Sequence, residues 1–127
     1  MAIKSFKELI VWQKSMDLVE QLYNATDEFP KDEIYCLTNQ MRRSAISIAS
    51  NIAEGQARKT TKDFLNFISI AQGSRAELET QIMIANRLGY IKGEKAEQLL
   101  EILAEIAKML YTLSSTLHLP ENRKTCE

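Results

Sequence analysis

Few residues of this sequence belong to the types that carry out nucleophilic, acid–base or metal chemistry. There is one histidine, His118, and the two cysteines, Cys36 and Cys126, stand 90 positions apart. A zinc site needs several His or Cys ligands, and a cysteine nucleophile needs a neighbouring histidine, so neither site is predicted. The spacing of the cysteines also predicts no disulfide framework.

Carboxylates are more frequent, but their pattern does not match a catalytic or metal-binding set. Acidic residues recur in the last third of the chain at Glu94, Glu97, Glu101 and Glu105. A metal-bearing helical bundle would add Glu-x-x-His repeats, which the sequence lacks. A glycine-rich phosphate loop and a serine nucleophile elbow are missing too. We therefore expect no enzyme activity, no cofactor, no metal and no small-molecule substrate.

Basic residues concentrate in the middle of the chain, although the net charge is only −1. Residues 38–75 contain six basic and two acidic residues, whereas residues 1–37 and 76–127 are net acidic. Cations on a loop beside a helix N-terminus are typical of phosphate binding, because free amides and the helix dipole also attract anions. The candidates for nucleic-acid contact are Arg42, Arg43, Arg58, Lys59 and Lys62. A solvated basic loop is the alternative.

The elements that must position these residues are expected to be few and long. The chain has 127 residues, 45% hydrophobic and 26% charged, which is typical of one globular domain. Its 4 glycines and 2 prolines are too few for the turns of a β-sandwich or barrel. No apolar run approaches the roughly 20 residues of a membrane span, and the start lacks a secretion signal, so we expect a cytoplasmic protein.

Apolar spacing and helix start and stop signals predict an all-α fold of four helices. The helices are expected at about residues 6–28, 31–57, 61–88 and 94–118, in one domain over residues 1–119 with a flexible tail at 120–127. Ser5 and Glu8 have capping-box spacing at the first start, and Gly89 is the expected C′ residue of the third helix. Short connections between long helices predict an antiparallel up-down-up-down bundle.

Polar and small residues gather on the second and third helices, away from their apolar seams. The cluster comprises Asn51, Glu54 and Gly55 of the second helix and Gly73, Ser74 and Glu77 of the third. A mid-helix glycine costs up to about 1 kcal/mol relative to alanine, so we expect close helix contact at Gly73. We interpret the cluster as structural, its polar members linking the two helices by hydrogen bonds in a shielded setting. A solvated face and a ligand surface are alternatives.

The first and fourth helices have more apolar surface than one core requires. The seam of the first helix is expected at Leu9, Trp12, Met16, Val19 and Tyr23. A second apolar face lies roughly opposite that seam, and apolar residues also flank the seam of the fourth helix. The candidates for a subunit interface are Val11, Leu18, Leu22, Ile102 and Met109. Exposed apolar surface favours association, so we expect self-association; a more deeply buried helix in a monomer is the alternative.

Three stretches resemble a known protein family. They are FKELIVWQKSMDLVEQLY, FPKDEIYCLTNQMRRSAISIASNIAEG and DFLNFISIAQGSRAELETQIMIANRLGYI. These are similar to the four-helix bundle proteins first noted in intervening sequences of bacterial large-subunit ribosomal RNA genes. The most specific parts are NIAEG at 51–55 and AQGS at 71–74 followed by Glu77. One departure is Ala49, where the family often has proline.

The resemblance implies a ring-like homopentamer with no known catalysis. The family is also similar to the accessory variability determinant of diversity-generating retroelements, a basic pentameric partner of a reverse transcriptase that binds nucleic acid. With the basic middle segment, this leads us to expect a non-enzymatic scaffold or accessory factor that binds RNA, a ribonucleoprotein or a nucleic-acid-processing protein. An interaction module for protein partners with no nucleic-acid affinity is the alternative.

Overall fold

The computed structural model describes residues 5–118, and within them the fold is all-helical with no strand. The long helices are α1 (Ile10–Thr26), α2 (Leu37–Gln56), α3 (Thr61–Arg87) and α4 (Gly93–Leu117). Two short 3-10 helices, η1 (Phe6–Glu8) and η2 (Lys31–Glu33), precede α1 and α2. Across the described residues, no helix has the length and apolar character to cross a membrane. The tail predicted at 120–127, with Cys126, lies outside this range.

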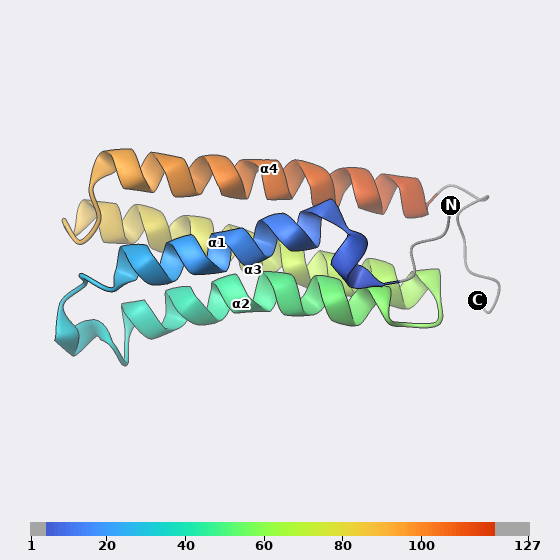
Figure 1. The fold of residues 1–127 in the computed structure, drawn as a ribbon, viewed down its shortest axis with the longest axis horizontal. Coiled ribbons are helices and arrows are strands. Elements are labelled where there is room, and N and C mark those ends of the chain that lie inside the picture. Colours follow the sequence, from blue (N-terminus) through green and yellow to red (C-terminus); the bar gives the residue numbers. More distant parts are fainter. Residues whose placement is uncertain (1–4, 119–127) are drawn as a thin grey trace.

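The four long helices lie side by side along the long axis of the molecule (Figure 1). Helix α1 packs against α2 and α4, and α3 packs against the same two helices, with the most extensive contact between α2 and α3. Each helix therefore has two neighbours, and one apolar core lies between all four. Fully buried side chains from all four helices fill it, including Leu18, Ile48, Leu78 and Leu103.

Helix α1 begins later than predicted because the chain becomes extended at Leu9, with φ −75° and ψ 123°. The Ser5 hydroxyl does cap a helix, accepting a hydrogen bond from the Lys7 amide at 3.2 Å, but this helix is only the single turn of η1. The Gln13 amide group donates to the Lys7 carbonyl oxygen at 2.8 Å across the break. The expected helix over 6–28 is thus a 3-10 turn followed by α1.

The connection between α1 and α2 is longer than predicted and is held by side chains. Instead of starting α2 at residue 31, the acidic segment forms η2, and the Glu33 carboxylate accepts a hydrogen bond from the Leu37 amide at 3.3 Å, at the true start of α2. The second oxygen of Glu33 accepts from the Tyr90 hydroxyl at 2.9 Å. The ring of Tyr90 also packs on Phe29, with centroids 5.6 Å apart. One carboxylate therefore ties the α1–α2 connection to the α3–α4 connection.

Helix α3 begins and ends with the capping signals expected from its sequence. The Thr60 hydroxyl accepts from the Asp63 amide at 3.1 Å. At the other end Gly89 has φ +80°, and the amides of Gly89 and Tyr90 donate to the carbonyl oxygens of Asn86 and Ala85. These two bonds make a Schellman motif, which confirms Gly89 as the C′ residue.

The apolar face of α1 that was predicted to meet another subunit faces the core instead. Leu18 and Leu22 are completely buried in the core of the single chain, so their assignment to a subunit interface is wrong, and Val11 is only 5% exposed. The predicted seam is half-buried: Leu9, Trp12 and Val19 pack against the core, whereas Met16 is 44% and Tyr23 38% exposed. The fourth residue of the buried stripe is Ser15, whose hydroxyl donates to the Val11 carbonyl oxygen at 2.7 Å. That bond satisfies a polar group that interrupts the apolar pattern.

Candidate functional site

The polar motifs of α2 and α3 meet through a side chain that belongs to neither. The hydroxyls of Ser47 on α2 and Ser74 on α3 lie 2.8 Å apart and share a hydrogen bond. The Asn51 amide group donates to both the Ser47 carbonyl oxygen, at 2.8 Å, and the Ser47 hydroxyl oxygen, at 2.9 Å. Of the residues expected to link the helices, Ser74 does so directly, whereas Asn51 bonds only to Ser47 of its own helix and supports the link from there. The centre of the link is Ser47, one helical turn before Asn51 on the same face.

The two motif carboxylates do not take part in this link, so their predicted linking role is wrong. Glu54 is exposed and accepts a hydrogen bond from Arg58 of its own chain segment at 2.8 Å. Glu77 is exposed as well and lies at the rim of a polar groove. Each carboxylate is solvated, so it needs no partner on the other helix.

Close helix contact occurs at Gly55 and not at Gly73. A Cβ added to Gly55 would lie 2.7 Å from the Phe67 Cβ and 3.0 Å from a ring carbon of Phe64, closer than real side chains pack. A Cβ added to Gly73 would meet no atom within 4 Å. The close approach of α2 to α3 therefore depends on Gly55, and the expectation for Gly73 is wrong.

A groove between α2 and α3 is lined only by polar side chains. Its lining residues are Gln40, Arg43, Ser44, Ser47, Ser74 and Glu77. We call it the α2–α3 polar groove. The Ser47–Ser74 hydrogen bond lies in its wall, so the motif residues shape this surface directly.

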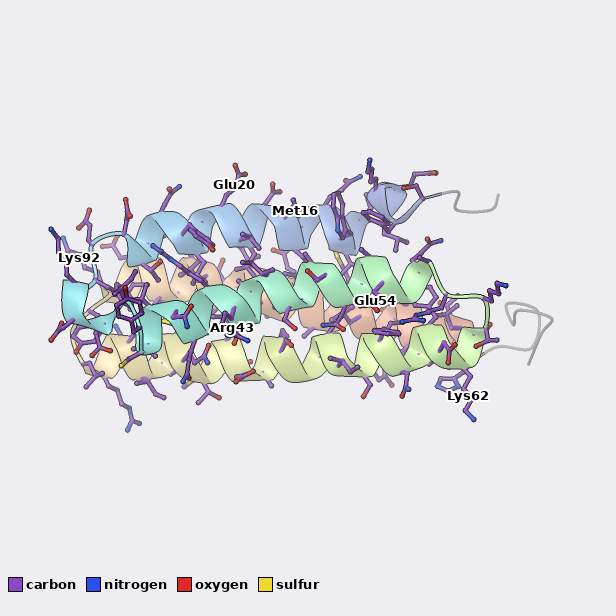
Figure 2. The ribbon with its side chains drawn as sticks, turned by 90° about the horizontal axis from the view of Figure 1, so that it is seen from below. Met16, Glu20, Arg43, Glu54, Lys62 and Lys92 are labelled. Carbon is purple, nitrogen blue, oxygen red and sulfur yellow. The ribbon has the colours of Figure 1, made fainter. Side chains whose placement is uncertain are left out.

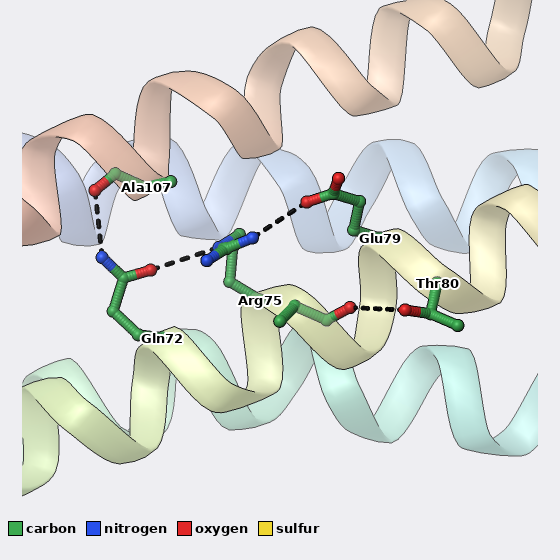
Figure 3. A network of polar contacts seen from close by, with 6 residues as sticks. Gln72, Arg75, Glu79, Thr80 and Ala107 are labelled. Carbon is green, nitrogen blue, oxygen red and sulfur yellow. Dashed lines mark hydrogen bonds and ion pairs between the residues drawn. The ribbon is translucent and has the colours of Figure 1, made fainter.

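A second polar network fixes α3 to α4 beside the same motif. The Gln72 side chain donates to the Ala107 carbonyl oxygen of α4 at 3.0 Å and accepts from Arg75 Nε at 3.1 Å (Figure 3). Arg75 also pairs with Glu79 at 2.8 Å. The network holds Arg75 along α3 between Gln72 and Glu79, so this cation is a structural residue.

The five basic candidates do not form one patch. Arg42 points to α1, where its Nε donates to the Thr26 hydroxyl at 2.9 Å and its guanidinium stacks on Tyr23 at 4.4 Å. Its neighbour Arg43 lines the α2–α3 polar groove, so the two arginines point in different directions. Arg43 and Arg58 are separated by about 22 Å at the 1.5 Å rise of a helix. Figure 2 shows Lys62 at one end of the molecule and Arg43 well away from that end.

The remaining three cations stay together at the α2–α3 connection. Arg58 and Lys59 lie in the connection and Lys62 in the first turn of α3, and all three are exposed. The Arg58 guanidinium is held by Glu54 and lies 4.8 Å from the Phe67 ring centre. Ala57, Arg58, Lys59, Thr60 and Asp63 line a shallow pocket here. The structure therefore brings together Arg58, Lys59 and Lys62 and separates them from Arg42 and Arg43.

Two apolar surfaces are accessible on opposite sides of α1. We call Trp12, Met16 and Val19 the α1 stripe; Met16 is exposed, whereas Trp12 and Val19 are half-buried and also pack against the core. The other surface, the α1–α4 groove, is lined by Leu9, Ile10, Val11, Lys108, Met109, Thr112, Leu113 and Thr116. Ile10 is 61% exposed there. Met109 and Ile102 are both half-buried against the core, and Met109 also lines the α1–α4 groove.

Within residues 5–118, no three His, Cys, Asp or Glu side chains lie close enough together to hold a metal ion. Cys36, at the start of α2, is exposed and unpaired with any other cysteine in that range.

Comparison with known proteins gives a match over most of the chain. The family model of the 23S rRNA-intervening sequence protein matches residues 7–112. A crystal structure of a protein with unknown function from the S23 ribosomal protein family of Bacteroides thetaiotaomicron is similar in fold, with a TM-score of 0.77. It shares 26% sequence identity and covers 84% of this chain and 96% of its own. No curated protein matches the chain.

Proposed function

This chain belongs to the 23S rRNA-intervening sequence protein family, and from that membership we propose that it is a non-enzymatic helical scaffold or accessory factor that assembles from identical subunits and contacts RNA. The observation that carries the proposal is the pair of uncovered apolar surfaces on opposite sides of α1. RNA or ribonucleoprotein partners would place this role in the cytoplasm.

For each subunit we propose an antiparallel up-down-up-down bundle. The chain colours run in opposite directions along consecutive helices in Figure 1, in support of this topology. The connections at 57–60 and 88–92 are short, as such a topology requires.

The assembly is proposed to be a ring-like homopentamer. Val11, Ser15 and Leu18 define the core-facing direction of α1, and the α1 stripe lies about 100° to one side of it. Ile10 and Lys14 lie about 100° to the other side, where Lys14 pairs with Glu105 of α4 at 2.9 Å. Two different apolar surfaces on one subunit suit head-to-tail contacts, which generate rings when the rotation closes. The number five comes from the family resemblance alone.

The proposed RNA contact is the basic group at the α2–α3 connection. Arg58, Lys59 and Lys62 are exposed beside the N-terminus of the long helix α3, where phosphate groups are attracted by both charge and helix dipole. Three neutralised phosphates would give a salt slope of about 2 to 3 per subunit. Repetition of the group around a ring would raise the avidity without changing the subunit.

The experiment is light scattering coupled to size exclusion, with and without a mixed RNA pool at low and moderate salt. A mass near five subunits that gains RNA in a salt-sensitive way supports the proposal. In the triple variant Arg58→Ala, Lys59→Ala, Lys62→Ala, RNA binding should weaken while the mass of the assembly stays unchanged. The matched control, Arg87→Ala, Lys92→Ala, Lys95→Ala, removes the same charge at the α3–α4 connection and should bind RNA as the parent does. Equal binding by both variants would exclude the α2–α3 connection.

The alternative is an interaction module for protein partners without nucleic-acid affinity. It is favoured by the net charge of −1 and by the ion pair that already occupies Arg58. An assembly that binds no RNA at low salt would favour this alternative. A stable monomer would contradict both the RNA-binding scaffold and the protein-interaction module.

A further inference from the structure

The α2–α3 polar groove has the properties of a binding site that the proposed scaffold role does not use. Its lining side chains come from two helices that are otherwise packed through an apolar core. A polar surface between packed helices is costly to dehydrate, so its groups need partners. The Asn51 amide group donates to the Ser47 hydroxyl, and the Ser47 and Ser74 hydroxyls are hydrogen-bonded to each other. Both hydroxyls are therefore fixed in the groove wall without a ligand.

Ser44 supplies a further polar group to the groove. Its residue is 5% exposed, its side chain lines the groove, and its hydroxyl makes no hydrogen bond to residues 5–118. This hydroxyl can therefore donate to or accept from a ligand in the groove.

Two opposite charges face the same groove without pairing. Arg43 comes from α2, beside α3 in Figure 2, and Glu77 comes from α3. Neither forms an ion pair within 4.0 Å with any residue of the described chain, whereas Arg58, Arg75 and Lys14 all do. A groove with one separated cation and one separated anion is complementary to a ligand that has both charges.

We propose that the α2–α3 polar groove binds a small zwitterion of the α-amino-acid class. The ligand carboxylate accepts hydrogen bonds from the Arg43 guanidinium, and its ammonium group donates to the Glu77 carboxylate. The Ser44 hydroxyl and the Gln40 amide supply the remaining polar contacts at the wall. Glu77 disfavours a simple anion, Arg43 disfavours a simple cation, and the polar lining disfavours an apolar ligand.

The test is isothermal titration calorimetry of the full chain with each of the common L-amino acids. Acetate and methylammonium serve as single-charge controls at the same concentrations. At least one amino acid should bind with a stoichiometry of one per subunit, while neither control gives a comparable signal. No binding of any amino acid at millimolar concentration would overturn the proposal, and so would equal binding of acetate.

Variants locate the ligand. Arg43→Gln and Glu77→Gln each remove one charge-assisted hydrogen bond and should weaken binding about tenfold or more, and Ser44→Ala should weaken it less. The matched controls are Arg87→Gln and Glu97→Gln, exposed residues outside the groove, which should bind as the parent does. Circular dichroism confirms that each variant is folded. Unchanged affinity in both Arg43→Gln and Glu77→Gln would contradict the assignment.

This inference is independent of the proposed RNA contact. Arg43 and Ser47 of the groove precede Arg58 by 15 and 11 residues, which at the helical rise is about 22 Å and about 16 Å. The mass of the assembly and its RNA binding, measured on the same variants, should therefore stay at parental values. A monomeric parent chain that still binds the amino acid would contradict the scaffold proposal alone, and a loss of assembly in the groove variants would contradict this independence.

Discussion

At the scale of single residues, Ser47 joins the α2 motif to the α3 motif by bonding to both Asn51 and Ser74. Ser47 belongs to neither motif, so the motifs alone do not predict this role. Asn51 and Ser74 were identifiable from sequence as polar residues on facing helices, but the side chain between them was one of several polar residues on α2. Glu54 and Glu77 have the same chemical suitability for a hydrogen-bonded link, yet both reach solvent. Sequence spacing gives the face of a helix and does not give the depth of a side chain below the surface.

The unequal roles of Asn51 and Glu54 predict unequal effects on stability. Asn51→Ala removes two hydrogen bonds to Ser47 and should lower the free energy of unfolding by about 0.5–1.5 kcal/mol. Glu54→Ala removes an exposed i,i+4 ion pair and should change it by less than about 0.5 kcal/mol. Urea denaturation followed by circular dichroism compares the two. A larger loss from Glu54→Ala would reverse the structural assignment.

Gly55 and Gly73 should respond to alanine in opposite directions. At Gly55 the added methyl group meets Phe67 at 2.7 Å, and overpacking of this kind costs about 1–3 kcal/mol. At Gly73 the methyl group enters open space, and the better helix propensity of alanine should stabilise the chain by up to about 1 kcal/mol. Thermal unfolding of the two variants beside the parent gives the signs. A destabilised Gly73→Ala would reveal a neighbour at that position in the assembled protein.

At the scale of elements, the helices of the core were predictable and the orientation of α1 was not. Residues 96, 99, 103, 106 and 110 on α4 form one unbroken apolar seam, and all are buried as the spacing indicates. Helix α1 has two apolar stripes, and their periodicity does not show which of them is buried in the core. Ser15 interrupts the buried one, but its hydroxyl is satisfied by the backbone of its own helix. The less buried stripe contains the larger side chains Trp12 and Met16, so its spacing indicated the core.

Helix ends that depend on local signals were predictable, and those that depend on distant contacts were not. Gly89 ends α3 through its own left-handed conformation. The late start of α2 depends on Glu33, whose carboxylate is positioned by Tyr90 from the other connection. The extended residue Leu9 interrupts the predicted helix without a neighbouring glycine or proline, so the sequence does not predict this break. Ala49, where the family often has proline, is buried in the uninterrupted helix α2.

The link between Tyr90 and Glu33 makes stability depend on pH in the alkaline range. The hydrogen bond to Glu33, followed by burial and the nearby charges of Glu33 and Asp32, raises the pKa of Tyr90 above its ordinary value. A raised pKa means that folding favours the neutral phenol. The resulting stabilisation is complete below the unfolded value of about 10 and is lost as the pH rises through the folded value. The stability difference between the parent and Tyr90→Phe should therefore be constant at neutral pH and shrink above about pH 10.

Chemical denaturation at a series of pH values measures this difference, and phenolate absorbance follows the titration itself. Tyr23→Phe is the control, because its ring stacks on Arg42 and its hydroxyl has no partner among the described residues. A parent and a Tyr90→Phe variant that lose stability in parallel at alkaline pH would contradict the link.

At the scale of the whole molecule, the uncovered apolar surfaces define how subunits are expected to meet. The α1 stripe and the α1–α4 groove lie on different sides of the subunit, so each contact would use one surface from each of two neighbours. Polar residues cover much of the remaining surface, including Glu20 and Lys92 in Figure 2.

A charge placed on either surface should therefore disrupt the assembly while leaving the fold intact. Met16→Glu alters the α1 stripe and Ile10→Glu alters the α1–α4 groove, and both positions are exposed within the subunit. Each should lower the mass measured by light scattering and leave the helical circular dichroism unchanged. Glu20→Lys, on the same helix but outside both surfaces, should assemble as the parent does. A parental mass in both Met16→Glu and Ile10→Glu would remove these surfaces from the interface.

The extensive packing between α2 and α3 also has a consequence for how the chain reaches its structure. These helices are joined by residues 57–60 alone, so bringing them together loses little loop entropy. The pairing of α1 with α4 joins residues as distant as Lys14 and Glu105 and must wait for both central helices. The α2–α3 hairpin is therefore the expected folding nucleus, with Gly55 at its tightest point. Substitutions there should slow refolding, whereas loss of the Lys14–Glu105 pair should mainly speed unfolding.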